Sequence, residues 1–223
     1  MRLACPVRRM TRLNASPYKF NAIRETFMTP SFFRGIAAAL ALSTLLAGPA
    51  LAADEHVAPM KQLAAAKVSA WAKDPVVIEA IKAQNAKHAS LSQADIDKMD
   101  KTWRAEVKSG GPMIQSVLDN KLSAFLKKVK ADAAGLYAEI FVMDDKGLNV
   151  GQSDVTSDYW QGDEAKWKET YSVGPDAVHI SKISTDESSQ TLQSQLSMAI
   201  ADPVSGKVIG AVTVGVNVEQ LGQ

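Results

Sequence analysis

The sequence predicts an α+β fold in which a five-stranded antiparallel sheet is covered on one side by helices. Apolar residues recur at helical spacing between residues 53 and 129. After Gly135 the spacing of apolar residues changes to two, which is the period of strands. The last apolar run, Val208 to Val218, is apolar on both faces, as a buried strand is. A long N-terminal helical segment is therefore expected to pack against a C-terminal sheet.

The distribution of charge argues against a nucleic-acid partner. Seven of the 25 basic residues precede position 53 together with a single acid, Glu25, which leaves 18 basic and 23 acidic residues from Ala53 onward. Binding to nucleic acid is dominated by neutralisation of phosphates and needs a basic face. The acidic balance of the later part of the chain does not provide one.

An export signal is expected within residues 28–52. A flank ending in Arg34 precedes the apolar run from Gly35 to Ala47, and small residues lead to Ala52. This is the pattern of a secretory signal peptide, and the run is short for a membrane span. We expect cleavage after Ala52 and a periplasmic protein without Cys5, the only cysteine. Translation from Met28 would most simply explain residues 1–27.

The sequence thus divides into three parts. Residues 1–52 are an N-terminal extension plus the cleavable signal peptide, residues 53–120 are the N-terminal helical segment, and residues 121–223 are the sheet domain. Within the helical segment, Asp74-Pro75 is expected to start a helix. Ser92 and Asp95 resemble a capping box that starts another. Trp71 and Trp103 are interpreted as packing residues of these helices.

Five strands follow from the apolar alternation. Residues 137–143 and 148–152 form a predicted hairpin around Asp144-Asp145-Lys146-Gly147. The third to fifth strands are expected at 177–183, 192–200 and 208–218, and a helix from about Asp163 to Thr170 connects the second strand to the third. Two strands, a helical connection and three antiparallel strands make a PAS-like topology.

One stretch, Asp158 to Trp167, combines large aromatic residues with carboxylates. Tyr159, Trp160, Trp167 and the following Tyr171 offer apolar faces with polar tips, which suits the lining of a small-molecule pocket. We interpret the stretch as a lid over such a pocket. The alternative is that Tyr159 and Trp160 plug the connecting helix against the sheet.

The sequence resembles the Cache, or PDC, family of extracytoplasmic PAS-like sensor domains in its single-module form. The resemblance covers about residues 58 to 221. It rests on Val142 to Val150, on the aromatic stretch, on Asp186-Glu187-Ser188, and on Val204 to Val216. It implies a ligand pocket between the sheet and the segment that links its second and third strands, and a role in signal transduction through chemotaxis receptors, kinases or cyclases. Because no transmembrane helix or output module follows the sheet in this sequence, we expect occupancy to be passed to a membrane receptor or kinase.

The resemblance and the aromatic stretch together define the candidate site. The resemblance places a ligand contact on Asp186. No arginine follows Arg104, so the sheet domain lacks a bidentate clamp for a carboxylate. Aromatic residues beside carboxylates instead favour an amine or another small metabolite with a cationic group, although Lys166 or Lys182 could meet an anion. The predicted ligand-binding residues are Tyr137, Phe141, Tyr159, Trp160, Trp167, Tyr171, Asp186, Ser188 and Gln195.

Other function classes find less support in the sequence. It contains none of the motifs HExxH, CxxC, GxSxG or a Walker-type glycine loop, so we expect neither an enzyme nor a cofactor. Asp154, Asp158, Asp163 and Glu164 lack the spacing of an EF-hand loop, and no metal site is predicted. A ligand-free structural or adaptor protein of the periplasm remains the alternative, and a homodimer through the N-terminal helices stays open. A cavity lined by Phe141, Tyr159, Trp160 and Gln195 would favour ligand binding over the adaptor.

Overall fold

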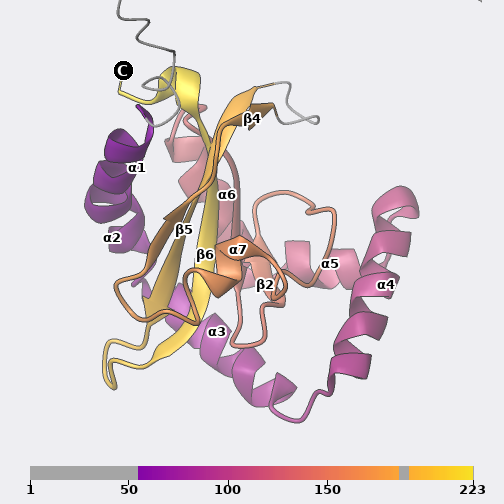
Figure 1. Cartoon of the computed structure of the whole chain (residues 1–223). Helices are drawn as coiled ribbons and strands as arrows, with labels where there is room; N and C mark the ends of the chain where they lie inside the picture. Colours follow the sequence, from indigo (N-terminus) through magenta and orange to yellow (C-terminus); the bar gives the residue numbers. More distant parts are fainter. Residues whose placement is uncertain (1–54, 186–190, 223) are drawn as a thin grey trace, which may run out of the picture. The chain divides into compact units, whose positions relative to one another are not determined.

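A single antiparallel sheet forms the centre of the structure (Figure 1). The computed structural model describes residues 55–185 and 191–222, so the predicted signal peptide and its cleavage point lie outside the described residues. The strand order is β2-β1-β6-β5-β3, with β4 also paired to β5. Both β3 and β4 pair with β5, at successive places along it, so together they occupy one position in the sheet. The six strands therefore fill the five positions predicted from the sequence. The strands are β1 (Tyr137–Met143), β2 (Asn149–Gln152), β3 (Val178–Ile180), β4 (Ser184–Thr185), β5 (Leu192–Ala201) and β6 (Val208–Asn217).

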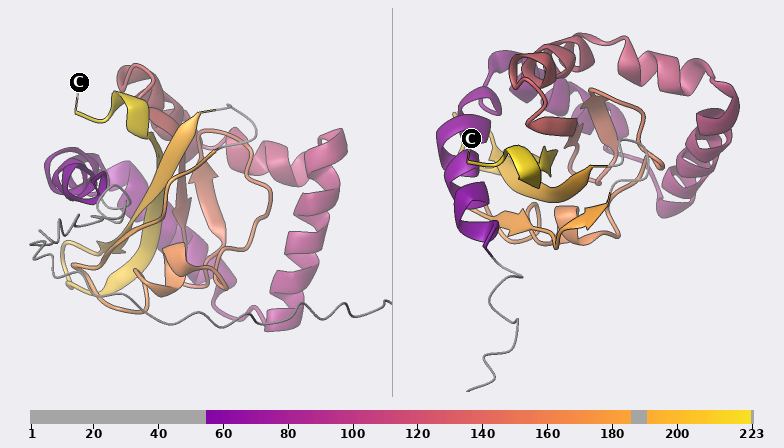
Figure 2. Two further views of the ribbon diagram at one scale, coloured as in Figure 1. Left: turned by 45° about the horizontal axis from the view of Figure 1, so that its top comes forward. Right: turned by 90° about the horizontal axis from the view of Figure 1, so that it is seen from above.

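Helices lie mainly on one face of this sheet. The N-terminal run is α1 (Val57–Leu63), the π-helical stretch η1 (Ala64–Val68) and α2 (Ser69–Trp71). It is followed by α3 (Pro75–His88), α4 (Gln93–Ser109), α5 (Pro112–Leu118) and α6 (Lys121–Asp132). The views in Figure 2 place α1, α3 and α6 on one side of the sheet and α7 (Ala165–Lys168) on the other. A 3-10 turn, η2 (Val218–Gln220), follows β6.

Two helix starts follow the predicted capping chemistry. The Asp74 side chain accepts a hydrogen bond of 2.9 Å from the backbone N–H of Val76 at the start of α3. Ser92 and Asp95 exchange side-chain and backbone hydrogen bonds in a complete capping box at the start of α4. These contacts satisfy N–H groups that have no partner within the helix, so the sequence itself determines where both helices begin.

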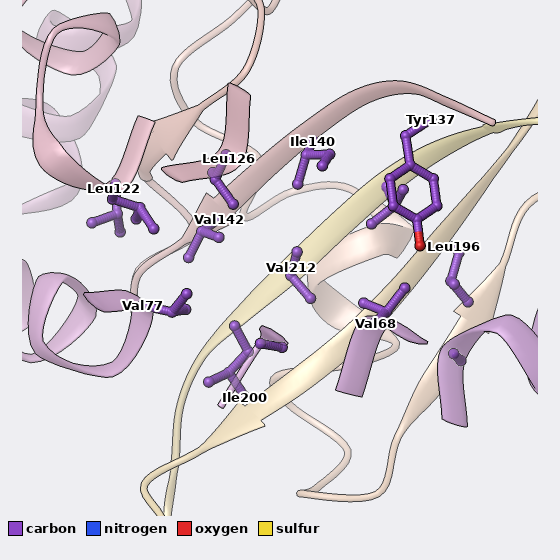
Figure 3. Close-up of a cluster of buried hydrophobic side chains, with 14 of the residues drawn as sticks. Val68, Val77, Leu122, Leu126, Tyr137, Ile140, Val142, Leu196, Ile200 and Val212 are labelled. Atoms are coloured by element: carbon purple, nitrogen blue, oxygen red, sulfur yellow. The ribbon is translucent and has the colours of Figure 1, made fainter. Parts of the chain in front are cut away.

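The main core lies between the helices and one face of the sheet (Figure 3). Ile140 and Val142 of β1, Val212 of β6 and Leu196 of β5 contribute to it, because alternate residues of a strand share a face. The helices add fully buried side chains, among them Met60, Val68, Val77, Ile81 and Leu126. The N-terminal helical segment is therefore part of the core of the sheet.

A second apolar cluster joins α4 and α5 to the β1–β2 hairpin. Trp103 of α4 is fully buried and stacks on Tyr159 with ring centroids 5.3 Å apart. Its indole N–H donates a hydrogen bond of 2.9 Å to the carbonyl of Thr156. Leu148 and Ile96 complete the contact between the hairpin and α4. As expected for a packing residue, Trp103 thus joins two segments that are far apart in the sequence.

The segment between β2 and β3 differs from the prediction. The expected helix from Asp163 to Thr170 is shorter, since α7 spans Ala165–Lys168. Glu164 is extended (φ −100°, ψ 158°), which sets the start of α7. The expected third strand is interrupted after Ile180, because the Ser181 hydroxyl accepts a hydrogen bond of 2.8 Å from the backbone N–H of Gln195. A side-chain oxygen thus takes the place of the backbone carbonyl that would otherwise continue the pairing of β3 with β5.

No helix within residues 55–185 and 191–222 combines the length and hydropathy needed to cross a membrane.

Candidate functional site

Polar side chains line the sheet face opposite the main core, which we call the open face. Glu139 of β1 and Gln195 of β5 both pair with Gly215 of β6, so the three residues form one row across the sheet. Gln195 Nε2 donates a hydrogen bond of 3.0 Å to Glu139 Oε1. In the next row, the hydroxyls of Thr213 and Ser197 lie 2.9 Å apart. Because opposite residues share a face, strand register alone brings these groups together.

Gly215 allows the side chains of Glu139 and Gln193, which come from the two neighbouring strands, to cross β6. A Cβ atom at this position would lie 2.7 Å from Glu139 Cγ and 2.8 Å from Gln193 Oε1, closer than such atoms approach. The absence of a side chain therefore lets Glu139 and Gln193 lean over the strand from its two neighbours. Gln193 is 8% exposed, and its Oε1 atom has no hydrogen-bond partner among the described residues.

The roof segment, residues 153–168, lies over this face and is fixed by buried polar contacts. The Asn149 side-chain amide donates to Thr156 Oγ1 at 2.9 Å and to the Asp158 carbonyl at 3.2 Å. Asp100 of α4 accepts hydrogen bonds from the backbone N–H groups of Tyr159 and Trp160 at 2.9 and 3.1 Å. The α4 helix therefore sets the position of the roof as much as the sheet does.

The open face and the roof segment enclose a cavity of about 330 Å³. Its floor comes from β1 and β5, and its roof from the loop after β2 and from α7. Charged and amide side chains dominate the lining. The lining residues are Glu139, Phe141, Val155, Thr156, Ser157, Asp158, Gln161, Lys166, Gln193 and Gln195.

The roof contributes a cation and a carboxylate to the cavity. Lys166 Nζ lies 3.0 Å from Glu164 Oε2 and 3.2 Å from Gln161 Oε1, and 5.3 Å from the centroid of the Phe141 ring. Asp158 accepts a hydrogen bond of 2.7 Å from Gln161 Nε2. Asp158 also lies 3.3 Å from Arg104, which reaches it from α4.

The aromatic residues of the roof segment, together with Tyr171 just after it, are not among the residues that line the cavity. Tyr159 is 3% exposed, and burial raises the pKa of its phenol above the ordinary value. Trp167 stacks on Tyr171 at 4.7 Å, and the pair covers Phe141, Met143 and Ala211. Burial also raises the pKa of the Tyr171 phenol. Trp167 and Tyr171 thus cover the part of the open face formed by Phe141, Met143 and Ala211.

Two indole N–H groups tie the roof to the β1–β2 turn. Trp160 Nε1 donates a hydrogen bond of 2.9 Å to the Lys146 carbonyl, and Trp167 Nε1 donates one of 3.2 Å to the Asp144 carbonyl. Trp160 also lies against Gly162, whose Cβ position would be 2.4 Å from the indole nitrogen. Trp160 therefore packs against the β1–β2 turn and the second cluster, and it is not among the residues that line the open-face cavity.

The structure brings part of the predicted site together. Phe141 and Gln195 line the cavity. Tyr159, Trp160, Trp167 and Tyr171 lie in the surrounding packing. Tyr137 lies in the main core on the opposite face, among Trp71, Leu63 and Val129. Asp186 and Ser188 lie outside the described residues.

Glu139, Gln193, Asp158, Gln161 and Lys166 line the cavity but were not among the predicted ligand-binding residues. The sequence carried a signal for two of them. Glu139 interrupts an apolar strand, and Gln193 alternates with Leu192 and Ser194 on the face away from the core. For the roof residues no sequence pattern separates those that point inward from their neighbours.

Within the described part of the chain, no group of three or more histidine, cysteine, aspartate or glutamate side chains is arranged to hold a metal ion.

Comparison with known proteins finds similarity to solved structures alone. No protein-family model matches the chain, and no curated protein sequence matches it. The sensor domain of the histidine kinase DctB from V. cholerae is similar over 76% of this chain and 58% of its own, with 13% identity and a TM-score of 0.38.

Two further similar structures are domains of the chemoreceptor Tlp3 from Campylobacter jejuni. The sensory domain with isoleucine bound is similar over 73% of this chain and 64% of its own, with 14% identity and a TM-score of 0.35. The ligand-binding domain in complex with 4-methylisoleucine is similar over 74% of this chain and 61% of its own, with 12% identity and a TM-score of 0.36. This chain thus spans less than two thirds of each of the three solved domains. All three are sensor or ligand-binding domains of a kinase or a chemoreceptor.

Proposed function

We propose that this chain is an exported sensor domain of the Cache type that binds a small molecule in the open-face cavity. One observation carries the proposal. A cavity of about 330 Å³ with a polar lining lies between a rigid sheet and a roof segment held by buried hydrogen bonds. Pockets of this size class with convergent polar groups are the usual sites of small ligands. In this proposal the domain acts in the periplasm and passes its occupancy to a membrane receptor or kinase, with a homodimer through the N-terminal helices as one arrangement for doing so.

The cavity lining supports a ligand that carries a cationic, hydrogen-bond-donating group. The carboxylates of Glu139 and Asp158 line it against a single ammonium group, that of Lys166. Gln193 adds a buried acceptor oxygen without a partner among the described residues. Acceptors of this kind pair with the N–H groups of an amine. The support therefore comes from oxygen acceptors of the strands and of Asp158 in the roof, and not from the roof aromatics on which the sequence interpretation relied.

Glu139→Gln tests this assignment. Replacing the carboxylate by an amide of the same shape removes the charge-assisted hydrogen bond, which is worth about 1.5–3 kcal/mol. We expect affinity for an amine to fall by about tenfold or more, with little change in melting temperature without ligand. Thermal-shift titrations with amines, amino acids and carboxylates measure both quantities, since a ligand at 100 times its Kd stabilises the fold by about 2.7 kcal/mol.

Glu169→Gln is the matched control, because Glu169 is an exposed carboxylate at the end of α7 that does not line the cavity. It should leave all ligand shifts unchanged. Stabilisation by carboxylates alone would contradict the amine assignment. Native mass spectrometry of protein purified from the periplasm provides an independent check, because it would show a retained ligand and the oligomeric state together.

A ligand-free structural or adaptor protein is the second candidate, and the position of Trp160 favours it. The indole packs against Gly162 and the β1–β2 turn, so the space beneath this ring is filled by the chain itself. If no compound of the panel shifts the melting temperature and native mass spectrometry shows only the bare chain, the adaptor function is the better assignment.

A further inference from the structure

The Lys166 ammonium lies inside the cavity, among groups of the kind that bind the cationic group of a ligand. Its ammonium lies over the Phe141 ring at 5.3 Å and contacts the oxygens of Gln161 and Glu164. An ammonium over an aromatic face, with carboxylate and amide oxygens beside it, is how proteins hold the cationic group of a ligand. The Lys166 side chain is 14% exposed, which is low for a lysine.

The same ring is the aromatic residue of the cavity lining. Tyr159, Trp160, Trp167 and Tyr171 do not line the cavity, so Phe141 is the aromatic residue among its described lining residues. Its ring is 1% exposed and packs beside Trp167 and Tyr171. That ring is already in contact with the ammonium of the chain. A cation that enters the cavity therefore meets a like charge at the place where the ring and the roof oxygens would bind it.

The carboxylates that line the cavity nevertheless favour a cationic ligand. Glu139 and Asp158 line the cavity on the sheet side and on the roof, respectively. Lys166 is paired with Glu164, which is partly exposed, and Arg104 reaches Asp158 from α4. An anionic ligand would have to displace Glu164 and approach two further carboxylates. A cationic ligand meets Lys166 as the cation among the described lining residues.

We propose that the Lys166 ammonium occupies the position that the cationic group of a ligand takes in the complex. A bound amine then displaces the Lys166 ammonium from the face of the Phe141 ring. The inference rests on the proposed function, because it concerns the same cavity. Lys166 sets the affinity threshold for amines, since every amine must compete with an ammonium that is tethered to the site. It also links occupancy to α7, because the next residue, Trp167, holds the β1–β2 turn through the Asp144 carbonyl.

Lys166→Met tests the competition with n-butylamine and butyrate as probes of equal chain length and opposite charge. Methionine keeps an unbranched side chain without the charge. We expect isothermal titration calorimetry to show at least about fivefold tighter binding of n-butylamine to the variant than to the unmodified chain. Lys166→Gln serves as a second neutral variant should the methionine variant melt at a lower temperature.

Lys168→Met is the matched control, because Lys168 lies two residues away on α7, is exposed and contacts the Asp163 carbonyl outside the cavity. It should change n-butylamine affinity by less than about twofold, as is usual for an exposed charge that makes no ligand contact. Equal or weaker n-butylamine binding by both neutral Lys166 variants would overturn the inference while leaving the proposed function intact. Binding of butyrate that is lost in Lys166→Met would overturn it as well, because Lys166 would then be the contact for an anion.

The rate of lysine acetylation, measured by mass spectrometry, separates failure of the inference from failure of the proposed function. In the free protein Lys166 should react more slowly than Lys168. Saturating n-butylamine should raise the ratio of the Lys166 rate to the Lys168 rate, because the reagent that the free amine consumes lowers both rates equally. If Lys166 reacts faster than Lys168 in the absence of ligand, the Lys166 ammonium is not held over the Phe141 ring. That result would overturn the inference whichever ligand the cavity binds. If neither the unmodified chain nor the variants bind n-butylamine, the amine-binding function fails, and the competition fails with it.

Discussion

At the scale of single residues, the Asp144 carboxylate organises the turn between β1 and β2. Its Oδ1 accepts hydrogen bonds from the backbone N–H groups of Lys146 and Leu148, each at 2.9 Å. Its Oδ2 contacts Gln84 Nε2 at 3.0 Å and His88 Nδ1 at 2.9 Å, both from α3. Asp144 is fully buried, so these partners replace the hydration that the carboxylate loses. The turn that carries the roof contacts is thereby tied to α3.

The neighbouring Asp145 is in the opposite situation. Burial is the main cause that raises the pKa of its carboxyl group, and the negative charge of Asp144 raises it further. Its Oδ1 atom is buried and has no hydrogen-bond partner in the described part of the chain. The charged form of Asp145 is therefore less favourable in the folded state than in the unfolded chain.

Asp145→Asn should consequently stabilise the fold at neutral pH. A raised folded-state pKa means that stability is lost as pH rises through the unfolded and folded pKa values, because the charged form is penalised only in the folded state. The gain in the variant should therefore be absent below the ordinary pKa of 3.8 and complete above the raised pKa. Urea unfolding at several pH values measures this, and a variant that is less stable at pH 7 than at pH 3, relative to the original chain, would contradict it.

At the scale of elements, the roof segment depends on α4 and on the β1–β2 hairpin. Trp103 stacks under Tyr159, and Asp100 holds the backbone N–H groups of the two residues that follow Asp158. Trp160 forms an isolated bridge with Leu148 of the hairpin. The roof thus has two anchors that come from different parts of the chain.

Trp160→Ala should accordingly lower stability rather than remove a ligand contact. The variant loses the apolar contact with the second cluster and the hydrogen bond to the Lys146 carbonyl. Buried tryptophan to alanine changes cost about 3–5 kcal/mol, and since Trp160 is only partly buried we expect about 2–3 kcal/mol. Chemical denaturation measures the loss. Trp160→Phe keeps most of the ring and should cost less, whereas equal losses in both variants would place the effect in the hydrogen bond alone.

At the scale of the whole described molecule, the N-terminal helices complete the core of the sheet. Met60 and Val68 are fully buried against the same cluster as Leu196 and Ile200 of β5. Helix and sheet therefore depend on each other, because neither could bury its apolar face alone. The helices α1, α3 and α6 cover one face of the sheet, which leaves the open face to the roof segment.

Removal of residues 54–73 should abolish cooperative folding. A chain that begins at Asp74 would expose the apolar face of β5 to water, at a cost of about 25 cal/mol for each Å² of apolar surface. We expect loss of the near-ultraviolet circular dichroism signal and of a cooperative urea transition, compared with a chain that begins at Ala53. A truncated chain that retains a sharp transition would show that the sheet domain folds independently from α3 onward.

Much of the fold could be predicted from the sequence because local patterns carry it. The alternation at Leu196, Met198 and Ile200 predicted which face of β5 meets the helices, and the structure confirms it. The caps at Asp74 and Ser92 are contacts between close neighbours in the chain. The split of the third strand at Ser181 was missed, because the hydroxyl that interrupts the ladder acts across strands.

The candidate site was predicted only in part, for a related reason. Phe141 and Gln195 lie on strands, where a period of two assigns each side chain to a face, and both line the cavity. Tyr159 looked like a wall of the pocket, yet it turns toward Trp103, which lies 56 positions earlier in the chain. A loop has no such period, so its side chains turn toward whichever distant partner buries them best.

By itself, then, the sequence determined the α+β class, the starts of α3 and α4 and the two faces of β5, because near neighbours decide those features. Only the tertiary structure decided which groups line the cavity. Gly215 lets Glu139 and Gln193 converge from two strands, and packing of Tyr159 and Trp160 against the second cluster keeps both rings out of the cavity that Lys166 lines. Those choices depend on contacts between residues that are far apart in the chain, and no local pattern encodes them.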